Sequence, residues 1–278
     1  MEILHYEFMR NAIWAGVLVS IACGIMGALV VVKRIVFMSG GIAHAAYGGI
    51  GLAIFIGIPP ILGATLFSVV IAILMGWFTF QNREGSDTVI GVMWALGMAL
   101  GVILVDLTPG YHRDLMSYLF GSILTVPPTD LVFMGLLDAL VLLVIGLFYK
   151  ELLSFSYDDT FTATRGVPVR LLHFLLLVLI ALSVVMLIRV VGLILVIALL
   201  TIPASIAGQF TYSLKRMMGL GCVLGAVFIL SGLWLSYEFN LTSGATIVMV
   251  ACTAYVLSAG GHSLRARMLK HRQHGTAE

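Results

Sequence analysis

Residues 36–57 read VFMSGGIAHAAYGGIGLAIFIG, a stretch without a charged side chain that carries a single histidine, His44. As a helix it is long enough to cross the ~30 Å hydrocarbon core of a membrane. An ionisable side chain at that depth is costly and by default marks a functional site. Imidazole is also a common ligand of transition metals. The stretch therefore predicts a membrane helix with a candidate metal ligand near its middle.

Similar apolar runs recur along the whole chain, in which 61% of the residues are hydrophobic and 10% are charged. This composition excludes a soluble domain, and the continuous rather than alternating runs argue against a β-barrel. We expect an all-α, polytopic membrane protein with one transmembrane domain over residues 1–262. Residues 263–278 are expected to form a basic, disordered cytoplasmic tail. The net charge of +2 says little about partners. The expected surroundings are membrane lipid, and no nucleic-acid partner is expected.

About eight or nine membrane helices are expected. The candidate spans are 13–32, 36–57, 61–80, 88–107, 131–149, 171–189, 191–207, 217–236 and 244–260. Loops on one side of these spans receive twelve of the 15 Lys and Arg residues, and those on the other side receive Arg10, Arg113 and Arg189. The positive-inside rule places the basic loops in the cytoplasm. We therefore expect a multi-pass protein of the cell (inner, cytoplasmic) membrane with its C-terminus in the cytoplasm.

The glycines near His44 form the second part of the candidate site. Gly40, Gly48 and Gly51 lie at helical spacing from His44, and Tyr47 lies one turn away. Small residues let a neighbouring backbone approach closely. This face is therefore predicted to line a pathway or to receive a partner helix. The alternative for His44 is a neutral, structural histidine that is hydrogen-bonded to Tyr47 or to another helix.

Three further polar residues are secondary candidates. Asp138 lies in the middle of its span, and Glu238 and Asn240 lie in the last outer turn. A carboxyl group in apolar surroundings must be neutral or paired, so Asp138 is either a proton relay or a structural hydrogen-bonding group. One histidine alone is a poor metal site, whereas two copies of the chain would supply two imidazoles.

Several enzymatic motifs are absent from the sequence. It has no G-x-x-x-x-G-K-[ST] loop, no H-E-x-x-H, no C-x-x-C and no G-x-S-x-G. The chain is therefore not expected to be an enzyme or to hold a tightly bound cofactor. Any energy for transport must come from a partner or from an ion gradient.

Seven short stretches, taken together, point to one family. They are residues 27–34, 39–51, 86–91, 114–124, 165–168, 192–205 and 241–246. With them, from residue 8 to about residue 258, the chain resembles the membrane permease subunits of the zinc, manganese and iron ABC importers. The resemblance implies a homodimer, two cytoplasmic ABC ATPase subunits that hydrolyse ATP, and an extracytoplasmic metal-binding protein. It also implies an ATPase-coupling segment that includes Pro203, Ala204, Ser205, Ala207 and Gly208.

Two positions depart from the family pattern. Many members carry Asp four residues before the histidine, where this chain has Gly40, and Asp in the last outer loop, where it has Asn240. Losing these oxygen ligands argues mildly against manganese and leaves zinc and ferrous iron open. A metal chelate, a non-metal solute and a gradient-driven secondary transporter remain alternatives to the expected import of a divalent metal ion.

Overall fold

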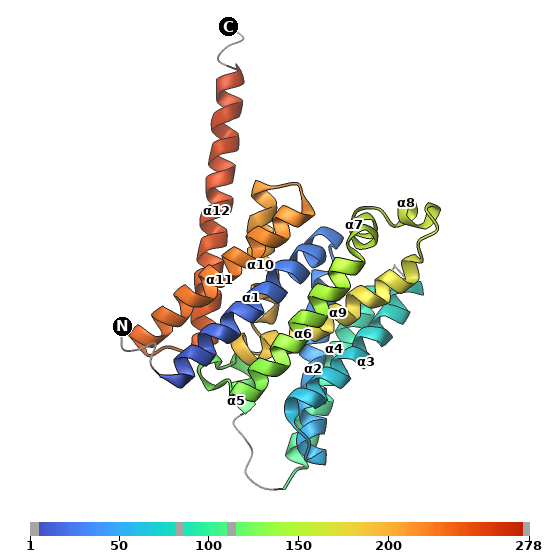
Figure 1. Ribbon diagram of the computed structural model, residues 1–278, viewed down its shortest axis with the longest axis vertical. Helices are drawn as coiled ribbons and strands as arrows, with labels where there is room; N and C mark the ends of the chain where they lie inside the picture. The colour runs from blue at the N-terminus through green and yellow to red at the C-terminus, as the bar shows by residue number, and fades with distance from the viewer. Residues whose placement is uncertain (1–5, 82–85, 110–114, 275–278) are drawn as a thin grey trace.

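The computed structural model describes residues 6–81, 86–109 and 115–274, and no strand occurs among them. The long helices follow one another up and down between two ends of the molecule (Figure 1), which confirms the predicted all-α class. The helices are α1 (Glu7–Lys33), α2 (Val36–Ile56), α3 (Pro60–Gln81), α4 (Ser86–Asp106), α5 (Leu115–Phe120), the 3-10 turn η2 (Ile123–Thr125), α6 (Pro128–Leu147), α7 (Tyr149–Tyr157), α8 (Asp159–Thr164), α9 (Val169–Val191), α10 (Val196–Phe210), α11 (Leu214–Phe239) and α12 (Ser243–His274).

Within the described residues, 8 helices are long and apolar enough to cross a membrane, namely α1, α2, α3, α4, α6, α9, α11 and α12. They agree with eight of the nine predicted spans. The ninth prediction, over 191–207, corresponds to α10, which has only 15 residues. Helices α9 and α11 both begin beside basic residues, at the same end of the molecule. Helix α10, which lies between them in the chain, must therefore run back to that end. At 1.5 Å per residue it covers only ~22 Å of the ~30 Å core.

The late start of α10 has a local cause at Gly192. This residue ends α9 with a left-handed φ of 77°, and a Cβ there would lie 2.2 Å from the backbone nitrogen of Gly121. The next two amides, of Leu193 and Ile194, donate to the carbonyls of Tyr118 and Leu119 in α5. The chain thus turns against α5, where only glycine allows the approach, before α10 begins.

The centre of the bundle is formed by α2, α9 and α1. Of the apolar 18-residue stretch in each of these helices, 78% is buried inside the protein in α2 and 72% in α9, but only 22% in α4 and in α12. The outer helices therefore turn apolar side chains to the surface, as lipid contact requires. Helix α2, which carries His44, is the most enclosed span.

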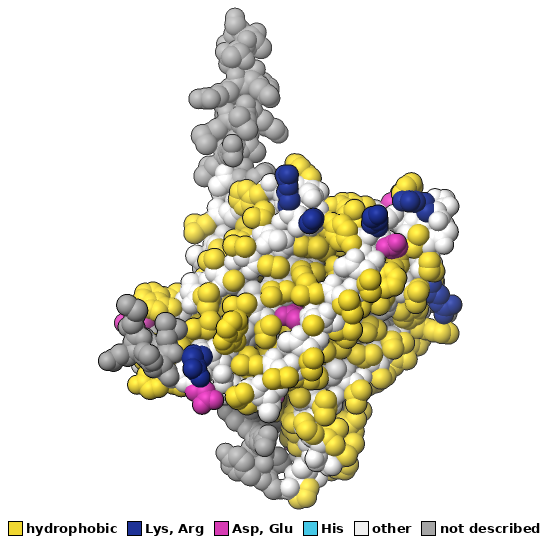
Figure 2. Space-filling model, viewed as in Figure 1, with side chains coloured by type: hydrophobic (Ala, Val, Ile, Leu, Met, Phe, Trp, Pro, Cys, Tyr) yellow, Lys and Arg dark blue, Asp and Glu magenta, His cyan; other side chains and the backbone are white. Residues whose placement is uncertain are grey.

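The two ends of the molecule differ in charge. Figure 2 shows a largely hydrophobic face with most of its Lys and Arg side chains at the end where α7 and α8 lie, as Figure 1 places them. We call this the basic end, defined by Lys33, Arg34, Lys150, Arg165, Arg170, Lys215 and Arg216. There Lys33 forms an ion pair with Asp159 and donates to the Phe155 carbonyl at 2.7 Å, which fixes α7 and α8 onto the end of α1. Arg83 and Arg113, also used in the charge count, lie outside the described residues.

The last helix is longer than the sequence predicts. The sequence analysis expects a disordered tail from residue 263, whereas the backbone of α12 continues as a helix to His274. Residues 275–278 of that expected tail lie outside the described residues. The boundary at 262/263 therefore does not coincide with the end of a helix.

Candidate functional site

His44 lies inside the molecule, on the third turn of α2. It follows the start of the helix at Val36 by eight residues, or about 12 Å of helix. Its exposed fraction is 7%. His44 is therefore buried within the protein, and its predicted depth in the membrane stays a prediction.

The His44 imidazole is held by an aromatic contact and not by hydrogen bonds. Its ring stacks on the indole of Trp94 from α4, with centroids 4.0 Å apart and planes inclined by 8°. Among the described residues, Nδ1 is buried without a hydrogen-bond partner. The alternative of a histidine that is hydrogen-bonded to Tyr47 or to another helix is therefore not what the structure shows. A free nitrogen on a buried imidazole is chemically able to bind a metal ion.

Trp94 is itself fixed by two neighbours. Its Nε1 donates to the sulfur of Met98 at 3.2 Å, one turn along α4. Its ring also lies 6.2 Å from that of Phe37, at the start of α2. The sequence analysis did not identify Trp94 or Met98. The sequence signal for them is the Gly97/Gly101 pair nearby, because glycines at helical spacing on two helices favour packing of one helix on the other.

The glycine face of α2 receives a helix in this structure. A Cβ at Gly48 would lie 2.8 Å from the carbonyl oxygen of Gly97, and one at Gly51 would lie 2.4 Å from that of Gly101. Helices α2 and α4 therefore pack backbone to backbone here, through small residues, as membrane helices often do. The predicted pathway-lining role of Gly48 and Gly51 does not correspond to an open passage in this conformation.

The two other predicted lining residues are also packed against protein. A Cβ at Gly40 would lie 2.4 Å from Cδ1 of Ile197 in α10, so Gly40 faces a different helix from Gly48. Tyr47 is buried, and its ring lies against Gly101 of α4. The structure thus gathers these residues around His44, and their contact with a solute stays a prediction.

The secondary candidates lie apart from His44. Asp138 of α6 has an exposed fraction of 3%, and neither carboxyl oxygen has a partner among the described residues. Glu238 is exposed at the end of α11. Asn240 caps that helix with a left-handed φ of 52°, a conformation that Asn tolerates well. The described residues contain no cluster of three His, Cys, Asp or Glu that could hold a metal ion.

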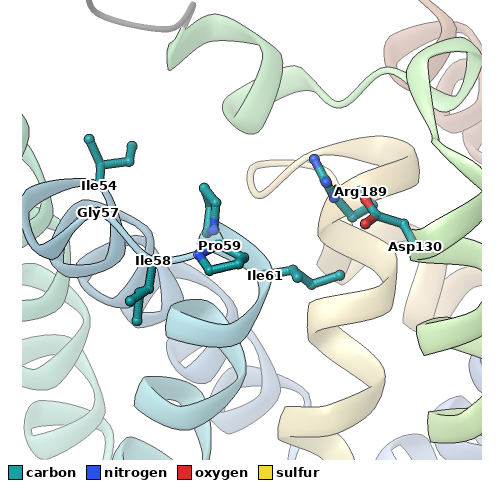
Figure 3. Close-up of a pocket in the computed structure, with 8 residues that line it drawn as sticks. Ile54, Gly57, Ile58, Pro59, Ile61, Asp130 and Arg189 are labelled. Atoms are coloured by element: carbon teal, nitrogen blue, oxygen red, sulfur yellow. Dashed lines mark hydrogen bonds and ion pairs between the residues drawn. The ribbon is translucent and has the colours of Figure 1, made fainter. Parts of the chain in front are cut away.

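A cavity that the sequence did not predict opens at the end opposite the basic end. It has a volume of about 550 Å³ and lies between the α2–α3 turn and an ion pair of Asp130 with Arg189 (Figure 3). Arg189 also lies over the ring of Tyr118, 5.9 Å from its centroid. The only sequence signal was the presence of opposite charges at two helix ends, Asp130 in the first turn of α6 and Arg189 in the last turn of α9.

The predicted ATPase-coupling segment stays a prediction, and its residues differ in exposure. Ala204 and Ala207 are fully buried, and Pro203 lies inside α10. The small side chains of Ala204 and Ala207 allow α10 to pack on α1. A Cβ at Gly27 of α1 would lie 3.3 Å from the Cβ atom of Ala204. Buried residues offer no docking surface, whereas Ser205 and Gly208 are partly exposed. The exposed part of the connection is formed by Phe210, Tyr212, Lys215 and Arg216.

Comparison with known proteins extends over nearly the whole chain. A family model described as "ABC 3 transport family" matches residues 5–260. An uncharacterised membrane protein of Synechocystis is 54% identical over 258 residues, which cover 93% of this chain and 92% of the relative. The manganese transport system membrane protein MntC of Halalkalibacterium halodurans is 33% identical and aligns over 92% of this chain and 88% of its own length.

A solved structure shares this arrangement of helices. The PsaBC structure from Streptococcus pneumoniae, determined in complex with a Fab, superposes with a TM-score of 0.84 at 33% identity. The match covers 92% of each chain. The fold is therefore shared with a solved structure over most of the chain.

Proposed function

The chain belongs to the ABC 3 transport family, and on that premise we propose that it is the membrane-spanning subunit of an ATP-driven importer for a divalent metal ion. The observation that carries this proposal is the free imidazole of His44 in the most enclosed helix of the bundle. An ionisable group without a partner at this depth is costly to the fold, which favours a role in handling a solute.

The identity of the ion is the finer part of the proposal. Relatives at 33% identity are named manganese transport proteins, which favours Mn²⁺. The donors favour borderline ions such as Zn²⁺ or Fe²⁺, because imidazole is present and Gly40 supplies no carboxylate. We propose these three ions as the candidate cargoes, and uptake measurements decide among them.

Energy is proposed to come from a separate ATPase subunit. The sequence contains no phosphate-binding loop of the Walker type. A docking surface is available in the α10–α11 connection, where Tyr212 is fully exposed beside Lys215 and Arg216. In this account, ATP binding and hydrolysis in the partner move that connection and open the pathway to alternate sides of the membrane.

The orientation follows from the charges. Because the basic end carries most of the Lys and Arg side chains that the structure describes, we propose that it lies in the cytoplasm together with the C-terminus, as the positive-inside rule requires. The opposite end, with its cavity at Asp130 and Arg189, then faces the outside of the cytoplasmic membrane. An extracytoplasmic metal-binding protein is proposed to deliver the ion there.

A second copy of the chain completes the proposal. The described part of one subunit has no cluster of three metal-ligating side chains, so one subunit offers the ion few ligands. A homodimer brings two His44 side chains to one transporter. A small number of ligands also suits a transport site, which must release its ion.

The test is uptake of radiolabelled Mn²⁺, Zn²⁺ and Fe²⁺ into cells that express the chain with its ATPase and binding protein. We expect uptake of one ion to be lost in His44→Ala and kept in His173→Ala, which removes an imidazole beside Phe80 instead. Unchanged uptake of all three ions in His44→Ala, with normal protein level, would refute the proposed role of His44.

A second function is favoured by one observation, the unpartnered carboxyl of Asp138. A secondary transporter driven by protons would need such a group within the membrane. Uptake that persists without the ATPase and is lost in Asp138→Asn would support this alternative. Uptake that requires the ATPase would exclude it.

A further inference from the structure

The His44 imidazole packs against one aromatic ring, that of Trp94. Histidines that bind metal ions almost always donate their second ring N–H to a carboxylate or a carbonyl, and this bond fixes the direction of the ring. Among the described residues His44 has no such bond. Its orientation must therefore be set by something else.

The stacked indole of Trp94 can supply this orientation. With planes 8° from parallel and centroids 4.0 Å apart, the two rings are in face-to-face contact. Rotation of the imidazole out of this plane would drive its edge into the indole. Metal ions bind the unprotonated imidazole nitrogen within the ring plane, so stacking on one face does not block that lone pair.

The contact also suits a ring that gains positive charge. An aromatic face attracts a cation, and tryptophan does so best among the aromatic side chains. An imidazole becomes electron-poor when it binds a divalent metal ion. The indole therefore stabilises the metal-bound form more than the free form.

Trp94 is anchored on its own helix. The bond from its Nε1 to the Met98 sulfur closes one turn of α4. A thioether is a weak acceptor on a flexible side chain, so this anchor holds the indole without making its position rigid. The Phe37 ring, at 6.2 Å, limits the indole on the side of the α2 start.

We propose that Trp94 is a positioning residue for the metal-binding histidine: it sets the plane of the His44 ring by stacking, in place of the usual hydrogen-bonded partner, and Met98 anchors it. The inference rests on the proposed function. It adds a positioning residue to that site, and an imidazole without a carboxylate partner is a weaker ligand, suited to a cargo that must be released.

The test uses the purified complex of the full chain with its ATPase partner and measures binding of radiolabelled Mn²⁺ and Zn²⁺ by equilibrium dialysis. Loss of an orienting partner typically weakens metal affinity by about 10–100-fold. We expect a loss of that size in Trp94→Ala, recovery to within about threefold in Trp94→Phe, and no loss in the matched control Trp234→Ala. If Trp94 acts through His44, the effects of the two substitutions on metal affinity are not additive. Trp94→Ala should then cause no further loss of metal affinity in a protein that already carries His44→Ala.

A spectroscopic measurement separates this role from simple packing. Replacing Trp14, Trp77 and Trp234 by Phe leaves Trp94 as the only tryptophan of the chain. If the tryptophans of the ATPase partner are also replaced by Phe, the tryptophan fluorescence of the complex comes from Trp94 alone. Metal binding at His44 should then change the emission, and His44→Ala should abolish that change.

Two results would overturn the proposal while the proposed function stands: metal affinity that Trp94→Ala leaves unchanged, or an equal loss of affinity in Trp94→Phe. Absence of both metal binding and metal uptake in the unaltered protein would instead overturn the proposed function and, with it, the role of Trp94.

Discussion

The close contact of α2 with α4 makes a strong prediction for Gly101. A Cβ at this position would lie 2.5 Å from the carbonyl oxygen of Tyr47. Carbon–oxygen contacts between helices are ordinarily ~3.3 Å or longer, so Gly101→Ala requires the helices to separate by ~0.8 Å. Overpacking of this kind costs about 1–3 kcal/mol, whereas Gly→Ala in an open helix position gains about 0.5–1 kcal/mol.

Helix α4 supplies a matched control for this change. A Cβ at Gly91 would have no atom within 4 Å. We therefore expect thermal unfolding in detergent to occur at a lower temperature in Gly101→Ala and at the same or a higher temperature in Gly91→Ala. Gly101→Ala should also disturb the stack of His44 on Trp94, because that stack joins the same two helices. Equal stability of the two variants would refute the backbone-to-backbone packing described here.

Three more predictions concern other parts of the chain. Arg189→Ala leaves the mostly buried carboxylate of Asp130 without its partner and should lower the unfolding free energy by about 1–3 kcal/mol, with part of the loss recovered in Asp130→Asn/Arg189→Ala; a thermal-unfolding series checks this. Tyr212→Ser removes the fully exposed aromatic side chain of the α10–α11 connection and should reduce stimulation of the partner's ATPase activity without changing stability; normal stimulation would place the docking surface elsewhere. Asp138→Asn should keep or raise thermal stability, because the buried carboxyl has no partner among the described residues, and should change ATP-dependent uptake by less than about twofold; a marked loss of uptake would instead place Asp138 on the transport route.

The sequence predicted the membrane fold well because its signal is local. Each long apolar run must form its backbone hydrogen bonds within itself in lipid, as a helix does. The positions of the membrane spans therefore follow from where the apolar runs lie along the chain. The exception is the predicted span 191–207. Its true start depends on the contact of Gly192 with Gly121, residues that are far apart in the chain.

The site was predicted less completely, because its other members come from different helices. His44 stands out as a candidate from its own surroundings in the sequence, and its role stays a prediction. Its contact with Trp94 depends on which helix covers the α2 glycines, and a single sequence does not state this pairing. The buried positions of Ala204 and Ala207 likewise depend on α10 packing against α1. Burial of that kind cannot be read from an apolar span, in which lipid-facing and protein-facing residues look alike.

The role of His44 in metal transport is tested most directly by metal uptake into proteoliposomes that contain the chain and its ATPase partner. The binding protein and the metal ion are added on the side of the membrane opposite the ATPase. We expect ATP-dependent accumulation of a divalent metal ion by the unaltered protein and by His173→Ala, and none by His44→Ala. ATP-dependent accumulation by His44→Ala at the unaltered rate would contradict it.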